Sequence, residues 1–353
     1  MSVKLGLIGC GNWGVNLLRN AVRLDNAQLK WACDADMSKL VHIKKCHPDI
    51  KCSSVFTEVL EDPEVDGVMI ATPPLSHAAL ARQALLAGKH VFVEKPLSLY
   101  TDDASNLVDL SEQKEKILMV GHLLRYHPGI IKLKEIIQEG TLGDIFYVYS
   151  QRLNLGVIRR HENALWNLSC HDVSVMVYLL DGLPVSVSAM GNAYVQEEVE
   201  DTAFVNLYFP NRQMAHIHVS WLDPHKVRKI TVVGSKRMAV FNDMEKKNKI
   251  IIYDKGFVTP ENDSLDRPIE IREGNWTYPR VHQQEPLHLE IQHFAECIRK
   301  NKPPKTGGLE GLRVVEILTA AQKSLENNGQ PQKLDYKRPQ IFISDKEMIK
   351  ATK

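Results

Sequence analysis

The chain has 353 residues, of which 44% are hydrophobic and 25% charged, and its formal net charge at pH 7 is +1. This length allows two domains with sizeable cores, and the balanced charge gives no reason to expect nucleic acid or a membrane surface as a partner. No apolar run is as long as a membrane span, and a strand-like segment begins within three residues of Met1, so we expect a cytoplasmic protein without a signal peptide.

The first third of the chain alternates between strand-like and helix-like segments. Short apolar runs typical of buried strands occupy 4–8, 29–34, 51–53, 65–71, 90–93 and 117–120. Helical patterns lie between them at 15–22, 37–46, 57–60, 78–87 and 101–113, and Ser76 is a candidate N-cap for the fourth. This alternation predicts a doubly wound parallel sheet of the Rossmann type over residues 1–122.

The rhythm changes after Gly121. Alternating strand patterns are expected at 144–154, 185–193, 202–209, 213–221, 228–233 and 237–242, and helices at 129–138, 168–180, 287–299 and 309–326. Consecutive strands predict a second, α+β domain over residues 123–335 with a large, open, mostly antiparallel sheet. Its exposed face would pack on another copy, so we expect a dimer or tetramer. Residues 336–353 form a polar tail that is either loose or wraps a neighbour.

The six cysteines give no sign of a metal site or of a disulfide framework. The densest cluster combines Cys46 and Cys52 with His42 and His47, and its gaps match no common ligand pattern. We expect no metal and reduced thiols. The six are Cys10, Cys33, Cys46, Cys52, Cys170 and Cys297.

A glycine-rich turn follows the first strand. Gly9-Cys10-Gly11-Asn12-Trp13-Gly14 spells G-x-G-x-x-G between a strand and a helix, and Asp34 ends the next strand twenty residues after Gly14. These features predict a dinucleotide site in which the turn and the helix N-terminus hold the pyrophosphate. Asp34 would bind the ribose hydroxyls and repel a 2′-phosphate, which favours NAD over NADP.

Two further strand ends should lie at the same edge of the sheet as the glycine turn. One carries Thr72-Pro73-Pro74 and His77, and the other carries Glu94-Lys95-Pro96. Ligands bind at the carboxyl ends of the strands in such sheets, so we expect Thr72, Pro73, His77, Glu94 and Lys95 near the cofactor. Lys95 would also contact the reacting hydroxyl, unless it is an ordinary surface lysine.

The second domain supplies the remaining candidates. His171 can take the proton of a hydroxyl as hydride leaves its carbon, or can simply pack where its helix opens. An arginine-rich rim would suit an anionic substrate, although a solvated loop would look the same. The expected substrate-binding residues are Arg125, Tyr126, Arg152, Asn154, Arg159, Trp166, Asn167 and His171, with Arg160 and His161 in the same loop as Arg159.

Together these segments resemble the Gfo/Idh/MocA family of oxidoreductases over nearly the whole chain. The matching segments are Gly9 to Gly14, Ala71-Thr72-Pro73-Pro74 with His77, Glu94-Lys95-Pro96, Gly121-His122 with Arg125-Tyr126, His171, and the stretch from Phe294 to Gly311. The resemblance implies a nucleotide domain, an open-sheet domain used for oligomer contacts, and hydride exchange between a nicotinamide cofactor and a sugar or polyol hydroxyl.

One position departs from the family pattern. Many members carry an aspartate four residues before the helix histidine, in D-x-G-x-H, and here Asn167 stands at that place. An amide can orient a hydroxyl but cannot accept its proton. The role of general base would then fall to His171, assisted by Lys95.

The Trp166-Asn167-Leu168 version of this segment, followed by His171-Asp172, resembles a branch of the family linked to nucleotide sugars. It implies NAD-dependent oxidation of C3 of UDP-N-acetylglucosamine to a 3-keto sugar. The alternatives are a ketoreductase of a dTDP-deoxysugar, an inositol-like polyol dehydrogenase, and a non-catalytic NAD-binding regulator.

Overall fold

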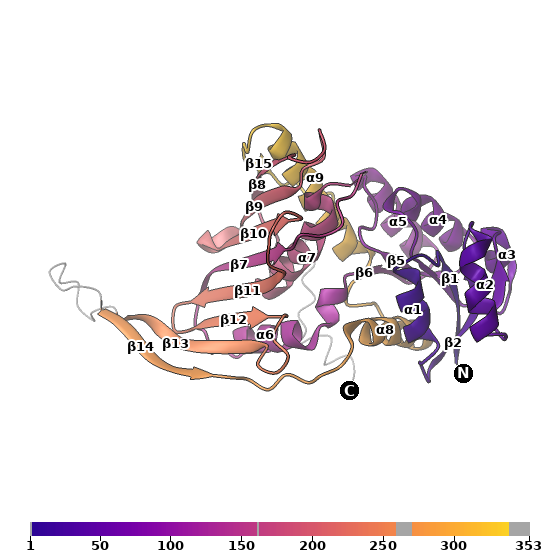
Figure 1. Cartoon of the computed structure of the whole chain (residues 1–353), viewed down its shortest axis with the longest axis horizontal. Helices are drawn as coiled ribbons and strands as arrows, with labels where there is room; N and C mark the ends of the chain where they lie inside the picture. The colour runs from indigo at the N-terminus through magenta and orange to yellow at the C-terminus, as the bar shows by residue number, and fades with distance from the viewer. Residues whose placement is uncertain (1, 161, 259–269, 339–353) are drawn as a thin grey trace.

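The computed structural model describes residues 2–160, 162–258 and 270–338. Two sheets lie beside one another, each covered by helices (Figure 1). Within these described ranges, no helix is both long and apolar enough to cross a lipid bilayer.

The first sheet is parallel and has six strands in the order β3-β2-β1-β4-β5-β6, which confirms the predicted Rossmann architecture. Its strands are β1 (Val3–Ile8), β2 (Ala27–Cys33), β3 (Lys51–Ser53), β4 (Gly67–Ile70), β5 (His90–Glu94) and β6 (Leu118–Gly121). The helices between them are α1 (Gly14–Ala21), α2 (Met37–Cys46), α3 (Phe56–Glu61), α4 (Pro74–Leu86) and α5 (Thr101–Gln113).

The central strands of this sheet are buried on both faces, as the apolar runs predict. Val68, Met69 and Ile70 of β4 have no exposed surface, and neither has Phe92 of β5. Helix α4 begins earlier than expected, with Pro74 in its first turn and Pro73 as its N-cap. The expected capping role of Ser76 is therefore wrong: Ser76 lies inside the helix, and its hydroxyl donates to the carbonyl of Pro73.

The second sheet has nine strands in the order β14-β13-β12-β11-β7-β10-β9-β8-β15. All neighbours are antiparallel except the central pair β7–β10, which confirms the mostly antiparallel expectation. The strands are β7 (Ile145–Leu153), β8 (Ser186–Asn192), β9 (Thr202–Tyr208), β10 (Met214–Ser220), β11 (Val227–Gly234), β12 (Met238–Asn242), β13 (Ile250–Val258), β14 (Glu270–Thr277) and β15 (Gln332–Lys333).

Strands β13, β14 and β15 were not predicted from the sequence. Strand β14 is polar and exposed along nearly its whole length, so it lacks the apolar alternation of a half-buried strand. Among the described strands it forms the outer edge of the sheet and pairs with β13. The hairpin of these two strands extends away from the rest of the molecule (Figure 1).

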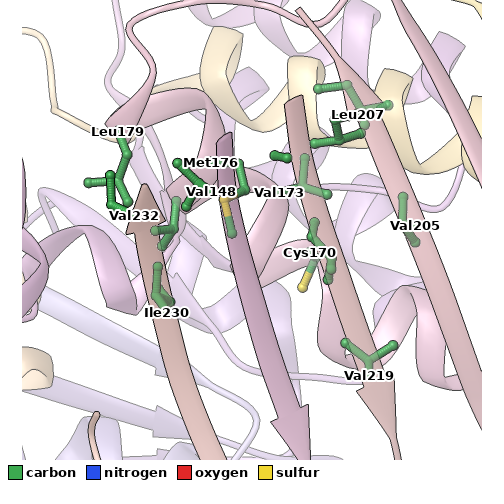
Figure 2. Packing of buried hydrophobic residues seen from close by; sticks show 14 of the residues in the cluster. Val148, Cys170, Val173, Met176, Leu179, Val205, Leu207, Val219, Ile230 and Val232 are labelled. Carbon is green, nitrogen blue, oxygen red and sulfur yellow. The ribbon is translucent and has the colours of Figure 1, made fainter. Parts of the chain in front are cut away.

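A layer of helices covers one face of this sheet. The helices of the second half of the chain are α6 (Pro128–Gln138), α7 (Cys170–Leu179), α8 (Pro286–Lys300) and α9 (Gly308–Glu326), with short helical turns η1 (Leu123–Tyr126), η2 (Leu165–Ser169) and η3 (Pro210–Arg212). Cys170, Val173 and Met176 of α7 pack on inward-facing residues such as Val148 and Val232 (Figure 2). This packing holds the start of α7 rigidly against the sheet.

Helices α8 and α9 connect the two halves of the molecule. Ile291 and Phe294 of α8 belong to the core of the first sheet, where Phe294 packs against Phe92. Helix α9 lies between α5 and β8. The first-domain fold thus includes residues from the far end of the chain, while the domain limits at 122 and 335 stay predictions.

The chain beyond β15 returns to the first domain. Lys337 pairs with Asp102, and Arg338 pairs with Asp109 and Glu112, all on α5. Most of the predicted tail, residues 339–353, lies outside the described residues.

Candidate active site

The glycine turn has the backbone that a pyrophosphate site needs. Gly9 has a φ of +92°, a conformation that other residues rarely adopt. A Cβ on Gly14 would lie 1.9 Å from the carbonyl oxygen of Gly9, so helix and turn pack too closely for any side chain. A Cβ on Gly11 would meet nothing within 4 Å. Gly11 therefore borders open space at the N-terminus of α1, where a phosphate can approach the backbone.

Asp34 is bound to the same turn. Its Oδ2 accepts the N–H of Cys10 at 2.7 Å and its Oδ1 accepts the N–H of Asp36 at 2.9 Å. The Nζ of Lys39 lies 3.2 Å from Oδ1. Burial raises the pKa of Asp34, but the two N–H groups and Lys39 outweigh it and leave the pKa below its ordinary value. Asp34 is thus an ionised acceptor beside the turn, as a ribose site requires.

Trp13 and Glu94 are joined to each other. The indole N–H of Trp13 donates to Oε1 of Glu94, which links the glycine turn to the end of β5. Glu94 is buried, and burial raises its pKa even though the Trp13 and Lys95 contacts act in the opposite direction. Asn12 is exposed at the tip of the turn.

His77 and Thr72 connect two strand ends. The Nδ1 of His77 lies 2.8 Å from the carbonyl oxygen of Pro96, and its Nε2 lies 2.9 Å from that of Thr72. The Thr72 and Ser76 hydroxyls are hydrogen-bonded at 2.7 Å. Both carbonyls are acceptors and a neutral imidazole has one N–H, so His77 donates to one of them and lies against the other, between the loops after β4 and β5. Its expected place at the cofactor stays a prediction. Pro73 remains at the N-terminus of α4.

Lys95 reaches from the first domain to the second. Its Nζ donates to the carbonyl oxygen of Asn167 at 3.0 Å, across seventy-two positions of sequence. Asn167 belongs to η2, the turn that leads directly into α7 and His171. Lys95 and His171 therefore lie at one junction between the domains.

His171 lies in the first turn of α7, as the sequence suggested, but that helix continues from a preceding helical turn. A wide π turn over Leu165–Ser169 precedes α7, so His171 lies on the second residue of an established helix. Such turns are frequent at functional sites. The Nδ1 of His171 is buried without a hydrogen-bond partner among the described residues. Burial lowers its pKa well below the ordinary value, and the charges of Lys95 and Arg152 lower it further, so the imidazole is neutral.

Arg152 and Asn154 are engaged inside the protein. Arg152 holds Asp172 through two hydrogen bonds, of 2.6 Å from Nε and 3.2 Å from Nη2. Asn154 accepts from Arg228 at 2.5 Å, and Arg228 also donates to the carbonyl of Leu153 at 2.8 Å. The charge of Arg152 is therefore largely neutralised by Asp172, which weakens the expected role in binding a diphosphate.

The other expected substrate residues divide into buried and exposed ones. Tyr126 is only 3% exposed, belongs to the core of the first sheet and faces the Thr306 hydroxyl at 3.3 Å, which favours a packing role over the predicted substrate contact. The guanidinium carbon of Arg125 lies 4.0 Å from the ring centre of Tyr178. Trp166 packs partly buried between the two domains, and Arg159 is exposed.

His161 of the predicted rim lies outside the described residues, whereas its neighbour Arg160 is exposed. The cysteines are all free thiols. Within the ranges that the structure describes, no three potential ligands gather as a metal site, and the Cys46 thiol instead lies 3.5 Å from Nε2 of His42.

Comparison with known protein families shows which family this chain matches. The model of the oxidoreductase family with an NAD-binding Rossmann fold matches residues 3–122, and the model of the C-terminal domain of the same family matches residues 130–240. The chain belongs to the Gfo/Idh/MocA family. The resemblance inferred from the Gly9–Gly14 and Glu94-Lys95-Pro96 motifs is confirmed.

Relatives of known activity cover almost the whole chain. The scyllo-inositol 2-dehydrogenase (NAD(+)) of Bacillus subtilis is 27% identical, over 95% of this chain and 97% of its own length. The UDP-N-acetylglucosamine 3-dehydrogenase of Acidithiobacillus ferrooxidans is 24% identical, over 92% and 97%. The solved structure of the latter superimposes with a TM-score of 0.78 and 23% identity, covering 94% of this chain and 99% of that one.

These findings define the class of activity. The chain is an NAD-dependent dehydrogenase that acts on a CH–OH group of a sugar or polyol. This activity argues against the alternative of a non-catalytic NAD-binding regulator. The residues present fit NAD, because the turn leaves open space at Gly11 and Asp34 offers an ionised acceptor next to Cys10.

Three residues near the site had no role in the sequence-based prediction. His122 is 1% exposed, and burial together with Arg125 and Lys95 lowers its pKa to about 3. Glu162 accepts a hydrogen bond from Asn167 at 2.8 Å, and Arg228 binds Asn154. His122 stood inside the quoted Gly121-His122 motif and could have been noticed. Glu162 and Arg228 carried no motif, so only the fold reveals them.

Proposed function

We propose that this NAD-dependent dehydrogenase oxidises the C3 hydroxyl of a UDP-N-acetyl amino sugar, UDP-N-acetylglucosamine in the first instance, to a 3-keto sugar. The observation that carries the proposal is the bond from Lys95 to the carbonyl of Asn167, which brings the lysine to the turn that leads into His171. The similarity to a UDP-N-acetylglucosamine 3-dehydrogenase supports the choice of sugar.

The roles of the two residues follow from their charge states. NAD⁺, when bound, accepts the hydride that leaves the sugar carbon. Neutral His171 has one unprotonated ring nitrogen, whose lone pair takes the hydroxyl proton as the carbonyl forms. Lys95 places a cation where the developing alkoxide needs stabilisation, and the neighbouring Asn167 carbonyl fixes its Nζ. Exposed Arg159 and Arg160 are available to the diphosphate.

A substrate panel tests the choice of sugar. The purified enzyme is incubated with NAD⁺ and, separately, with UDP-N-acetylglucosamine, scyllo-inositol, myo-inositol and glucose, and NADH formation is followed. We expect turnover with the nucleotide sugar and at most weak turnover with the others. Efficient oxidation of an inositol, with none of the nucleotide sugar, would sink the proposal.

An inositol dehydrogenase is the second candidate. Relatives with that activity are 27% identical over nearly the whole chain. In addition, Arg152 is paired with Asp172 and Arg228 with Asn154 and backbone carbonyls, so fewer cations are free for a diphosphate than the sequence suggested. The same panel separates the two candidates.

Substitution of the two central residues tests the mechanism. Lys95→Ala and His171→Ala should each lower kcat by about 10²–10⁴-fold, because each removes a group that acts on the hydroxyl. The NAD⁺ affinity of the His171→Ala variant, measured by calorimetry, serves as the control and should change little. Full turnover in either variant contradicts the assigned roles.

We also propose that the open face of the nine-stranded sheet forms a dimer or tetramer interface. Outward-facing aromatic side chains run across its middle strands: Phe204 stacks on His218 with ring centres 4.3 Å apart, and Tyr147 stacks on Tyr149 at 6.3 Å. Such contiguous exposed apolar surface is typical of an interaction site. Light scattering measures the mass, and a monomer at micromolar concentration would contradict it. A cytoplasmic location stays a prediction.

A further inference from the structure

One carboxylate near the junction of Lys95 and His171 has no role in the site described so far. Burial lowers the pKa of His171, and the cations Lys95, Arg152 and Arg228 lower it further, so the proton that leaves the substrate enters a buried, positively charged environment. Asp172 is bound by Arg152, and Glu94 by Trp13. Glu162, whose carboxylate accepts a hydrogen bond from Asn167 of the turn η2, has not been given a role.

Glu162 is connected to Lys95 through Asn167. The side-chain Nδ2 of Asn167 donates to Oε2 of Glu162 at 2.8 Å, and the backbone carbonyl of Asn167 accepts from Nζ of Lys95 at 3.0 Å. The other carboxylate oxygen, Oε1, is buried and has no hydrogen-bond partner among the residues that the structure describes. One residue thus links a carboxylate on one side to the lysine on the other.

The negative charge of Glu162 affects groups in both segments that meet at the junction. It opposes the lowering of the pKa of buried His77, next to the loop of Lys95, and it contributes to the raised pKa of Cys170, the neighbour of His171. Burial is the larger cause in both cases. Glu162 therefore lies close enough to influence the two segments that carry Lys95 and His171.

We infer that Glu162 supplies, from outside the D-x-G-x-H pattern, the carboxylate that this chain lacks at position 167. Asn167 binds this carboxylate, and the two residues act together. Glu162 fixes the Asn167 segment, whose carbonyl holds Lys95. The negative charge of Glu162 also balances the cations around His171 while that histidine carries the substrate proton. Glu162 is a positioning residue. The inference rests on the proposed hydroxyl oxidation but not on the identity of the sugar.

Moving the carboxylate tests the inference. Glu162→Gln should lower kcat by about tenfold to a hundredfold with little change in KM or in NAD⁺ affinity, because a charged hydrogen-bond partner is lost. The double variant Glu162→Gln/Asn167→Asp returns a carboxylate to position 167 with an amide opposite, and it should recover most of the lost kcat. A purely structural role for Glu162 would not produce that recovery.

A neighbouring pair provides the matched control. The side chain of Asn163, next to Glu162 in the chain, donates to Glu200 at 2.6 Å and to Gln322 of α9 at 3.0 Å. Asn163 meets Asn167 through the backbone, where its carbonyl accepts the Asn167 N–H at 3.0 Å, and the Glu200 side chain takes no part in that bond. Glu200→Gln should leave kcat within about twofold of the unmodified enzyme. An equal loss of kcat in Glu162→Gln and Glu200→Gln would overturn the inference, as would a double variant no better than Glu162→Gln.

A second measurement needs no substrate. Asn167→Asp alone puts two carboxylates where a 2.8 Å hydrogen bond stood, so its Tm should fall more at pH 8 than at pH 5, and Glu162→Gln should abolish that difference. Strictly additive Tm changes overturn the inference whatever the substrate is.

Kinetics are run with UDP-N-acetylglucosamine and with both inositols. If only an inositol is oxidised, the proposed sugar fails, and the Glu162 series is judged on the inositol reaction. If neither class is oxidised, the proposed function fails, and the Tm cycle alone decides the Glu162–Asn167 pairing.

Discussion

The cofactor side and the substrate side of this site are built in different ways. On the cofactor side, the glycine turn and Asp34 lie within one strand-turn-helix-strand unit, and the contacts that matter are backbone N–H groups and the space left by missing side chains. On the substrate side, the contacts join side chains far apart in sequence, such as Lys95 with Asn167 and Arg152 with Asp172.

The difference affects how each side responds to substitution. The cofactor side depends on backbone conformation and on the space left by missing side chains, so it tolerates little added volume. It contains few buried charges. The substrate side consists of buried ions that compensate one another, and removing one partner leaves the other uncompensated in a poorly solvated place. We therefore expect damage to stability on the substrate side and damage to cofactor affinity on the other.

The largest effect should come from the buried ion pair of the substrate side. Arg152→Met leaves Asp172, which is 1% exposed, without its bidentate partner, and should lower the free energy of unfolding by about 3–5 kcal/mol. Urea denaturation measures this change. Arg152→Met/Asp172→Leu removes both charges and should regain most of it.

The hairpin offers a matched control for that substitution. Arg237, in the exposed turn between β11 and β12, pairs with Asp254 of the hairpin strand β13, and Arg237→Met should cost no more than about 1 kcal/mol. Equal losses in the two arginine variants would mean that burial does not distinguish these pairs, and the contrast between the regions would fail.

A smaller effect is expected in the glycine turn. A methyl group on Gly11 meets no protein atom, so Gly11→Ala should fold with unchanged stability, within about 0.5 kcal/mol. The same methyl group occupies the space where the pyrophosphate approaches the backbone, and it should raise the Kd for NAD by about a hundredfold, or about 2.7 kcal/mol. Calorimetric titration measures the affinity; undiminished binding would show that the dinucleotide does not use this turn as expected.

The smallest effect concerns a buried carboxyl behind the cofactor side. Glu290 of α8 has no exposed surface, and both its oxygens lack partners among the described residues. Burial raises its pKa well above 4.5, and the charge of Glu94 raises it further. The folded protein then binds this proton more tightly than the unfolded chain does, so this group's contribution to stability is complete below pH 4.5 and is lost as pH rises through the folded-state pKa.

Glu290→Gln removes that loss. The variant should be more stable than the unmodified protein by about 1–2 kcal/mol at pH 8, with a smaller difference at pH 4.5, as measured by denaturation across that range. Glu61→Gln, at an exposed position on α3, is the control and should be neutral. A gain that does not depend on pH would show that ionisation is not its cause.

Much of the fold could be predicted because its patterns are local. The buried runs of β4 and β5 alternate with helices, and the inward-facing residues of β7, β9 and β10 alternate with outward ones, so period and chain order suffice. Strand β14 could not be predicted, because a polar edge strand is stabilised by its neighbour and not by burial of its own side chains. The N-terminus of α4 was misplaced, because Pro73 sets it without a side-chain cap.

The sequence by itself determined the cofactor seat, since a G-x-G-x-x-G turn and an acid on the next strand are local features whose geometry follows from backbone conformation. It also indicated Lys95 and His171 as the candidates for the chemistry, an assignment that stays a prediction. Only the tertiary structure decided which groups remain available: it placed Tyr126 in the core, set His77 between two backbone carbonyls, paired Arg152 with Asp172, and brought Glu162 to Asn167. The physical reason is that charge compensation and burial depend on neighbours from other segments, which no local pattern specifies.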